Sequence, residues 1–160
     1  SMSARVAKAF GMNVIAWSPN LTAERAAEHG AQCVNRDELF RQADFLTVHM
    51  VLSETTRDLV GASELGLMKP SAYLVNTSRG PLVNEKALIA ALTSGSIAGA
   101  GLDVFDVEPL PTDHPFRRLD NVILTGHTGY VIKEMFELAY GQALENILSW
   151  QEGDPIRLLN

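Results

Sequence analysis

The sequence predicts an α/β protein built on a doubly wound parallel sheet, similar to a Rossmann fold. Short apolar runs alternate with amphipathic stretches of helical length along the whole chain of 160 residues, which is the pattern of repeated strand and helix units. The run at residues 72–75 contains only side chains that can be buried on both faces, as a central parallel strand requires. Asn76, Thr77 and Ser78 follow this run, so polar groups stand at the carboxyl end of the strand, where open α/β sheets bind ligands.

Glycines and prolines separate the expected elements in the first half of the chain. Gly11 and Gly30 each follow a helical stretch, where a glycine accepts the left-handed conformation that ends a helix. Pro70 ends another helical stretch, because the residue before a proline avoids the helical conformation. The expected helices are residues 4–10, 21–29, 36–42 and a segment ending at 68, and the expected strands are residues 13–17, 32–34, 45–49 and 72–75.

The second half of the chain continues this alternation. Asn84 is expected to cap the N-terminus of a helix. Gly95, Gly99 and Gly101 lead into a strand instead of leaving one, so we interpret them as a tight turn with close backbone packing and not as a phosphate-binding loop. The expected elements are a helix at 85–93, strands at 96–105 and 121–125, a proline-rich loop at 106–120 between them, and a long amphipathic helix at 130–151.

The composition excludes several classes of function. Its hydrophobic fraction of 46% and charged fraction of 20% are typical of a soluble globular domain. With a net charge of −6 and 13 scattered Lys and Arg residues, no nucleic-acid partner is expected, and a small molecule is the expected partner. Cys33 is the only cysteine, which excludes an internal disulfide and fits a reducing cytoplasm. No apolar run approaches the roughly 20 residues of a membrane helix, and no set of side chains has metal-ligand spacing.

Three ionisable residues follow successive strand units: Arg79, Glu108 and His127. The strand ends of one sheet converge on one crevice, so an arginine, a carboxylate and a histidine can meet there. A histidine paired with a carboxylate is held in one tautomer and can deliver or accept a proton, and an arginine fork matches a substrate carboxylate. Each residue taken singly also has a structural interpretation: Arg79 as a surface residue, Glu108 as a loop charge before a proline, and His127 as the cap of a strand end.

A set of short segments in a fixed order is more specific than any one of them. The segments are residues 10–12, 48–52 with 56–57, 68–70, 75–83, 101–105 with 108–109, and 127–129. Together they resemble the nucleotide-binding domain of the D-isomer-specific 2-hydroxyacid dehydrogenases, a family that includes D-3-phosphoglycerate dehydrogenase and glyoxylate/hydroxypyruvate reductases. The resemblance runs from about Ala4 to Leu159.

The resemblance implies an oxidoreductase that transfers a hydride between NAD(P)H and a small 2-keto or D-2-hydroxy acid. It implies that Arg79 binds the substrate's carboxylate and keto oxygen, that His127 is the acid/base for the hydroxyl, and that Glu108 holds the histidine. The residues it implies in cofactor binding are Ser18, His49, Met50, Val51, Thr56, Thr77, Ser78, Arg79, Asp103, His127 and Gly129.

The surroundings of the histidine depart from the family pattern. Family members usually have Pro before it and Ile-Gly-Gly or Ile-Gly-Ala after it, whereas Gly126 precedes His127 here and Thr128, Gly129 and Tyr130 follow. Tyr130 is therefore expected to narrow the pocket.

Ser18 is a second departure, because an aspartate commonly stands there to bind the adenosine ribose. Neither a carboxylate for NAD nor an adjacent arginine for a 2′-phosphate is present. NAD is the expected cofactor, and NADP stays open beside it.

The start of the chain is the largest departure. In the family, a Gly-x-Gly-x-x-Gly turn, the first strand and most of a substrate domain come before the residue aligned with Ser1. We therefore expect residues 1–160 to be a single NAD(P)-binding domain, incomplete at its N-terminus and without the substrate domain. A gap is expected between the strands at 13–17 and 45–49, and its exposed edges favour a homodimer. Weak cofactor binding and no turnover are expected of this fragment by itself.

Two other functions stay open. A dinucleotide-sensing interaction module, as in transcriptional corepressors that resemble the family, would bind the cofactor without turnover. A catalytically inactive remnant would do neither. The presence of Arg79, Glu108 and His127 together favours an enzyme, because a sensor needs no acid/base pair.

Overall fold

The structure, a computed structural model, describes residues 2–158. The chain forms two compact units, unit 1 at residues 1–126 and unit 2 at residues 127–160, and each is described by itself.

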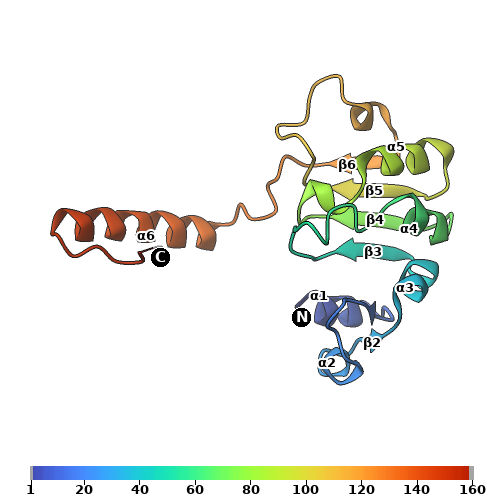
Figure 1. Cartoon of the computed structure of the whole chain (residues 1–160), viewed down its shortest axis with the longest axis horizontal. Coiled ribbons are helices and arrows are strands. Elements are labelled where there is room, and N and C mark those ends of the chain that lie inside the picture. Colours follow the sequence, from blue (N-terminus) through green and yellow to red (C-terminus); the bar gives the residue numbers. More distant parts are fainter. Residues whose placement is uncertain (1, 159–160) are drawn as a thin grey trace. The chain divides into compact units, whose positions relative to one another are not determined.

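Unit 1 contains two parallel sheets (Figure 1). The smaller sheet pairs β1 (Ile15–Ala16) with β2 (Gln32–Cys33). The larger sheet has the order β3 (Phe45–Val48), β4 (Tyr73–Asn76), β5 (Gly99–Leu102) and β6 (Val122–Leu124). Parallel strands joined through helices confirm the predicted α/β class. Within residues 2–158 no pairing joins β1 to β3, so the gap expected between these two strands is present.

Several helices of unit 1 begin and end at residues whose chemistry predicts it, although the helix expected at 21–29 is shorter, because Thr22 is its N-cap and Glu28 its C-cap. Asn35 accepts a hydrogen bond from the Glu38 N–H at 2.9 Å, and the Glu38 carboxylate accepts one from the Asn35 N–H at 3.3 Å. Asn84 accepts from the Ala87 N–H at 2.9 Å, as predicted, and Gly95 ends the same helix with φ +71°. The helices are α1 (Met2–Ala9), α2 (Ala23–Ala27), α3 (Arg36–Gln42), α4 (Ala62–Leu67) and α5 (Glu85–Ser94), with 3-10 helices η1 (Gly80–Leu82) and η2 (Pro115–Arg118).

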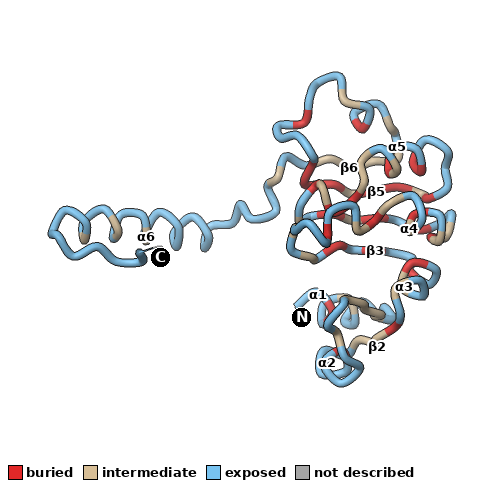
Figure 2. The backbone as a smooth tube through the Cα atoms, in the orientation of Figure 1, coloured by how far each residue is buried: buried red, intermediate tan, exposed pale blue. Residues whose placement is uncertain are grey.

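The core of unit 1 lies on one face of the larger sheet (Figure 2). Leu46, Leu74 and Ala100 are in register across three strands and are all buried. Leu65 of α4 and Leu88 of α5 belong to the same buried cluster, so these helices cover that face. The burial of apolar side chains between the helices and the sheet is the main source of stability for this unit.

The opposite face of the larger sheet is exposed. Phe45 and Tyr73 are paired across β3 and β4, are 62% and 45% exposed, and stack with their ring centroids 5.6 Å apart. Burial of residues 72–75 on both faces was expected, and this is wrong for Tyr73. Alternate residues of a strand point to opposite faces, and α4 and α5 cover only one of them.

Gly99 confirms the expected close backbone packing at this end of the sheet. A Cβ atom at this position would lie 2.6 Å from the carbonyl oxygen of Asn121 and 3.1 Å from the ring of Tyr73. β5 is shorter than the expected strand at 96–105, because its pairing covers four residues with β4 and three with β6.

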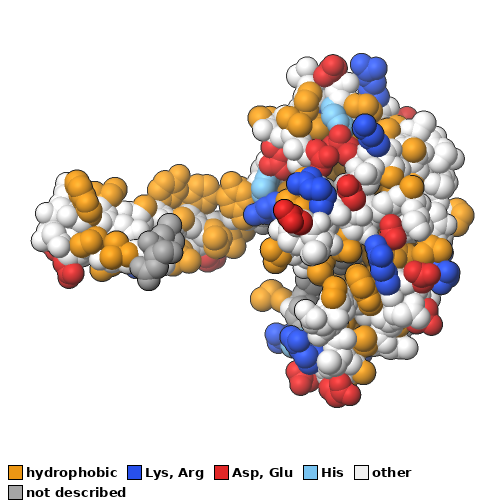
Figure 3. Space-filling model, viewed as in Figure 1, with side chains coloured by type: hydrophobic (Ala, Val, Ile, Leu, Met, Phe, Trp, Pro, Cys, Tyr) orange, Lys and Arg blue, Asp and Glu red, His pale blue; other side chains and the backbone are white. Residues whose placement is uncertain are grey.

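Unit 2 consists of a turn followed by α6 (Lys133–Gln151). The helix begins at Lys133 and not at Tyr130 as expected, because Ile132 is its N-cap with an extended backbone. Figure 2 shows no buried residue along α6, and hydrophobic side chains cover much of it in Figure 3. Across the described residues, no helix combines the length and apolarity of a membrane span.

Candidate active site

The carboxyl ends of three strands lie at one edge of the larger sheet. Val48, Asn76 and Leu102 are paired across β3, β4 and β5, and each is at or next to the end of its strand. The segments that follow, at residues 49–56, 77–80 and 103–108, therefore leave the sheet at the same edge. This is the edge at which open α/β sheets bind ligands.

The side chain of Asn76 builds the turn after β4. It is 1% exposed, donates to the carbonyl of Arg79 at 2.9 Å and accepts from the Ser78 N–H at 3.1 Å. The Ser78 hydroxyl donates to the carbonyl of Val48 at 2.8 Å, which ties this turn to the end of β3. Sequence reasoning treated Asn76 as a group available to a ligand. The structure shows that both polar ends of its side chain hold the turn that presents Thr77, Ser78 and Arg79.

Arg79 extends from this turn with an exposed side chain, and its Nη1 donates to the carbonyl of Ser78 at 2.6 Å. The next residue, Gly80, touches the segment after β5. A Cβ atom on Gly80 would lie 2.1 Å from the carbonyl carbon of Phe105 and 2.6 Å from the backbone nitrogen of Asp106. Only glycine fits here, and the approach fixes the base of the arginine against the β5 loop.

Two carboxylates follow β5 and differ in environment. Asp103 is 5% exposed, and its carboxylate accepts from the Thr125 hydroxyl at 2.5 Å. Glu108 is exposed, and its carboxylate accepts from the Phe105 N–H at 2.9 Å. Asp103 is therefore a buried residue that joins β5 to the end of β6, whereas Glu108 has a carboxylate oriented by its own loop.

The loop after β3 is held by Thr56. Its hydroxyl donates to the carbonyl of Val51 at 2.7 Å and accepts from the Ser53 N–H at 2.7 Å, and the residue is 9% exposed. Val51 is 83% exposed, and the ring of His49 contacts the Thr47 hydroxyl at 3.0 Å. This loop is therefore held from within, and the exposed His49 and Val51 stand on either side of the half-buried Met50.

Two further candidates do not follow a strand of the larger sheet directly. Ser18 follows β1 in the smaller sheet, and its carbonyl accepts from the Leu21 N–H at 3.2 Å. His127 lies in unit 2, three residues after β6, with φ +56°. Its ring meets the ring of Tyr130 at 90° with centroids 5.7 Å apart, and the exposed Gly129 lies between the two in sequence.

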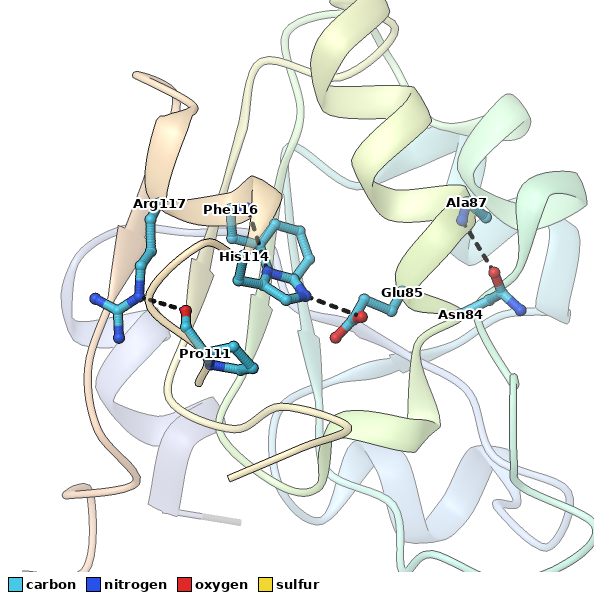
Figure 4. A network of polar contacts seen from close by, with 7 residues as sticks. All are labelled: Asn84, Glu85, Ala87, Pro111, His114, Phe116 and Arg117. Carbon is cyan, nitrogen blue, oxygen red and sulfur yellow. Dashed lines mark hydrogen bonds and ion pairs between the residues drawn. The ribbon is translucent and has the colours of Figure 1, made fainter. Parts of the chain in front are cut away.

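A polar network anchors the loop at 106–120 (Figure 4). The Nε2 atom of His114 lies 3.1 Å from a carboxylate oxygen of Glu85 on α5, and its Nδ1 accepts from the Phe116 N–H at 3.3 Å. Arg117 donates from Nε to the carbonyl of Pro111 at 2.9 Å. His114 therefore ties this loop to α5 and to the start of η2 through its two ring nitrogens.

Negative charges accumulate beside this network. Desolvation raises the pKa of Asp106, and the negative charges of Glu85 and Asp58 raise it further, while Arg57 and His114 oppose the shift. Among the described residues, no group of three or more His, Cys, Asp and Glu side chains is arranged to hold a metal ion.

The family is decided by a match that covers most of the chain. Residues 1–129 match the model of the D-isomer specific 2-hydroxyacid dehydrogenase, NAD binding domain. The chain belongs to this family. A glyoxylate reductase of Aeropyrum pernix is 41% identical over 161 residues, which cover 100% of this chain and 48% of the relative. A D-3-phosphoglycerate dehydrogenase of Methanocaldococcus jannaschii is 43% identical over 149 residues, 92% of this chain and 28% of that protein.

Solved structures of 2-hydroxyacid dehydrogenases share the fold. An oxidoreductase from Ralstonia solanacearum superposes with a TM-score of 0.93 at 39% identity, covering 99% of this chain and 47% of that chain. The NAD complexed form of a D-isomer specific 2-hydroxyacid dehydrogenase from Lactobacillus delbrueckii ssp. bulgaricus has a TM-score of 0.80 at 30% identity. The match covers 98% of this chain and 51% of that chain. The chain thus spans about half the length of the glyoxylate reductase and of these two chains.

The residues at the carboxyl edge fit part of an NAD site, and NAD is the cofactor of the matched domain. The turn at Ser78 and the loop held by Thr56 are preformed by hydrogen bonds within the protein, and both follow strands that end at this edge. A glycine-rich turn of the Gly-x-Gly-x-x-Gly type does not occur in the 160 residues.

Proposed function

We propose that the whole protein is an NAD(P)-dependent D-2-hydroxyacid dehydrogenase that acts on a small 2-keto or D-2-hydroxy acid, as glyoxylate reductases and D-3-phosphoglycerate dehydrogenases do. The observation that carries the proposal is the position of three ionisable residues after successive parallel strands. Arg79 follows β4, Glu108 follows β5 and His127 follows β6. An arginine, a carboxylate and a histidine are the set that proton-coupled reduction of a keto acid requires.

Arg79 has the role of holding the substrate. Its guanidinium is exposed and its base is fixed by Gly80 and by the Asn76 turn, so the fork is presented from a rigid support. A planar guanidinium binds a carboxylate through two parallel hydrogen bonds, which also orients the neighbouring keto oxygen.

His127 has the role of the proton donor and acceptor. When bound, the nicotinamide would supply a hydride to C2 of the keto acid, or accept one from C2 of the hydroxy acid. In the reducing direction His127 gives its proton to the keto oxygen as the C2–H bond forms, and in the oxidising direction it takes the proton of the hydroxyl. Glu108 keeps the imidazole in one tautomer by accepting a hydrogen bond from the ring nitrogen that faces away from substrate.

The cofactor is proposed to lie along the carboxyl edge of the larger sheet. The main chain at His49, Met50 and Val51 and the turn at Thr77 and Ser78 face its ribose and phosphate groups. Thr56 holds the first of these segments. Asp103 is proposed to meet the nicotinamide carboxamide, and Gly129 the same end of the cofactor.

NAD(H) is proposed as the preferred form over NADP(H). Ser18 is able to hydrogen-bond a ribose hydroxyl, and no arginine follows it in the turn at 18–20 to meet a 2′-phosphate. A homodimer is part of the same proposal, supported by the exposed apolar side chains of the sheet face and of α6.

A dinucleotide-sensing module is the second candidate function. The preformed cofactor segments would serve it equally well, but the acid/base pair would have no use there. Titration of the whole protein with NADH, followed by a turnover assay with glyoxylate and related 2-keto acids, separates the two functions. Binding with turnover supports the enzyme, binding alone supports the sensor, and the absence of both supports an inactive remnant.

The roles are tested by substitution in the whole protein. His127→Ala should lower kcat by roughly 100- to 10,000-fold, the range that general acid–base catalysis contributes, with little change in NADH affinity. Glu108→Gln should alter the pH dependence of kcat/KM. His29→Ala, on an exposed residue beyond α2, is the matched control and should leave both unchanged. A wild-type pH profile in the Glu108→Gln variant would contradict the pairing.

A further inference from the structure

His127 occupies an unusual backbone conformation. Its φ of +56° lies in the left-handed region, which a residue with a side chain adopts only where the surrounding structure holds it. The turn that follows is closed by main-chain hydrogen bonds. The Val131 N–H donates to the carbonyl of Thr128 at 2.9 Å, and the Ile132 N–H donates to the carbonyl of Tyr130 at 2.9 Å. The first of these bonds closes a turn with Gly129 and Tyr130 at its centre.

The side chains of His127 and Tyr130 meet in an edge-to-face contact. Their centroids are 5.7 Å apart and their planes are perpendicular, which is a favoured geometry for two aromatic rings. A contact of this kind changes the population of a side-chain rotamer by roughly two- to tenfold. The family usually has glycine or alanine at the position of Tyr130, so the contact is a property of this chain.

We infer that Tyr130 is a positioning residue that holds the imidazole of His127 in one orientation. An effect of Tyr130 on catalysis rests on the proposed function, because it requires His127 to be the acid/base. The contact between the two rings can be measured without turnover. Tyr130 is 59% exposed, so its ring is not required to fill a core. Its contact with the ring of the proposed acid/base restricts the orientation of that ring instead.

The test compares two substitutions at this position in the whole protein. Tyr130→Phe keeps the ring and Tyr130→Leu removes it. Tyr130→Leu should lower kcat roughly two- to tenfold with the KM values for cofactor and substrate unchanged, and Tyr130→Phe should restore the wild-type value. The loss should vanish when Tyr130→Leu is made in the His127→Ala background, because a residue that acts through the histidine has no effect without it.

A matched control comes from another ring pair in unit 2. Phe136 and Tyr140 stack on α6 with centroids also 5.7 Å apart, and Tyr140 is 69% exposed. Tyr140→Leu removes another exposed, paired ring from the same unit and should leave kcat unchanged. Equal loss of kcat in Tyr140→Leu and Tyr130→Leu would overturn the positioning role.

A spectroscopic readout separates failure of this inference from failure of the proposed function. Nuclear Overhauser contacts between the ring protons of His127 and Tyr130 should appear in the wild type, and contacts between the histidine and the substituted ring should appear in the Tyr130→Phe variant. If the wild type shows these contacts but no turnover with any 2-keto acid, the proposed function fails and the restraint on the histidine stands. If the wild type turns over and shows no ring contacts, the inference fails and the proposed function stands.

Discussion

The buried amide of Asn76 donates a hydrogen bond of 2.9 Å to the main-chain carbonyl of Arg79. Its oxygen accepts from the Ser78 N–H, so one side chain pairs with two main-chain groups of the turn. The last residue of β4 therefore takes part in placing the arginine, together with the close approach of Gly80 to the β5 loop. A substrate-binding side chain gains precision when its base belongs to a strand.

Asn76→Ala should destabilise the protein by about 2 kcal/mol, because it leaves the Ser78 N–H without its partner and the Arg79 carbonyl with only the longer bond from the Leu82 N–H at 3.3 Å. Urea denaturation measures the change. A midpoint within error of the wild type would show that the turn pairs these groups in another way.

Gly80→Ala should be among the most damaging single substitutions, with a cost of about 3 kcal/mol or more, because the new methyl group would overlap the backbone of Phe105. Gly66→Ala is the matched control. No atom lies within 4 Å of a Cβ at this position in α4, and a helical glycine replaced by alanine should gain about 0.5–1 kcal/mol. Similar effects of the two substitutions would contradict the close approach at Gly80.

His114→Ala should release the loop at 106–120 at a cost of about 1–2 kcal/mol, because it removes both the contact with Glu85 and the acceptor for the Phe116 N–H. Amide hydrogen exchange should become faster in this loop while the strands of the larger sheet keep their protection. Uniform acceleration across unit 1 would show instead that the loop and the sheet open together.

Asp106→Asn should stabilise the protein at neutral pH. The pKa of Asp106 is raised in the folded state, so its ionisation disfavours folding. The contribution of Asp106 to the free energy of unfolding is fully present below the pKa of about 4 that an aspartate has in the unfolded chain. It is lost as the pH rises through the raised pKa of Asp106 in the folded protein. The gain should stay within about 1 kcal/mol, because solvent screens this exposed group, and it should disappear below about pH 4.

Denaturation of the Asp106→Asn variant at pH 3 and pH 7 checks this sign. Asp120→Asn serves as the control, because it removes another exposed carboxylate of the same region. An equal gain at both pH values would exclude a titration effect.

Elements with local causes were predictable from the sequence. Asn84 caps α5 through a residue three positions away, and Gly95 ends that helix through its own backbone conformation. The alternation of strands and helices, and the gap between β1 and β3, follow from the same kind of reasoning.

Contacts between distant segments were not predictable. The approach of Gly80 to Phe105 and the contact of His114 with Glu85 join residues more than 20 positions apart, and no spacing in the chain indicates them. For the candidate site, the sequence led to Arg79 as an expectation but not to the buried amide that places it. The sequence does not distinguish a buried asparagine from an exposed one, because the burial depends on the conformation of the turn around it.

The order β3-β4-β5-β6 has a consequence for how the protein assembles. Each pair of neighbours in the larger sheet is also consecutive along the chain, and paired residues are fewer than 30 positions apart. β1 and β2 are likewise consecutive, so neither sheet needs a strand from the other to form its ladder. Pairing between consecutive strands keeps the chain closed by each ladder short, which limits the entropic cost of forming a parallel sheet. During synthesis from the N-terminus, the larger sheet can grow by one strand at a time, with each new strand adding to an edge that already exists.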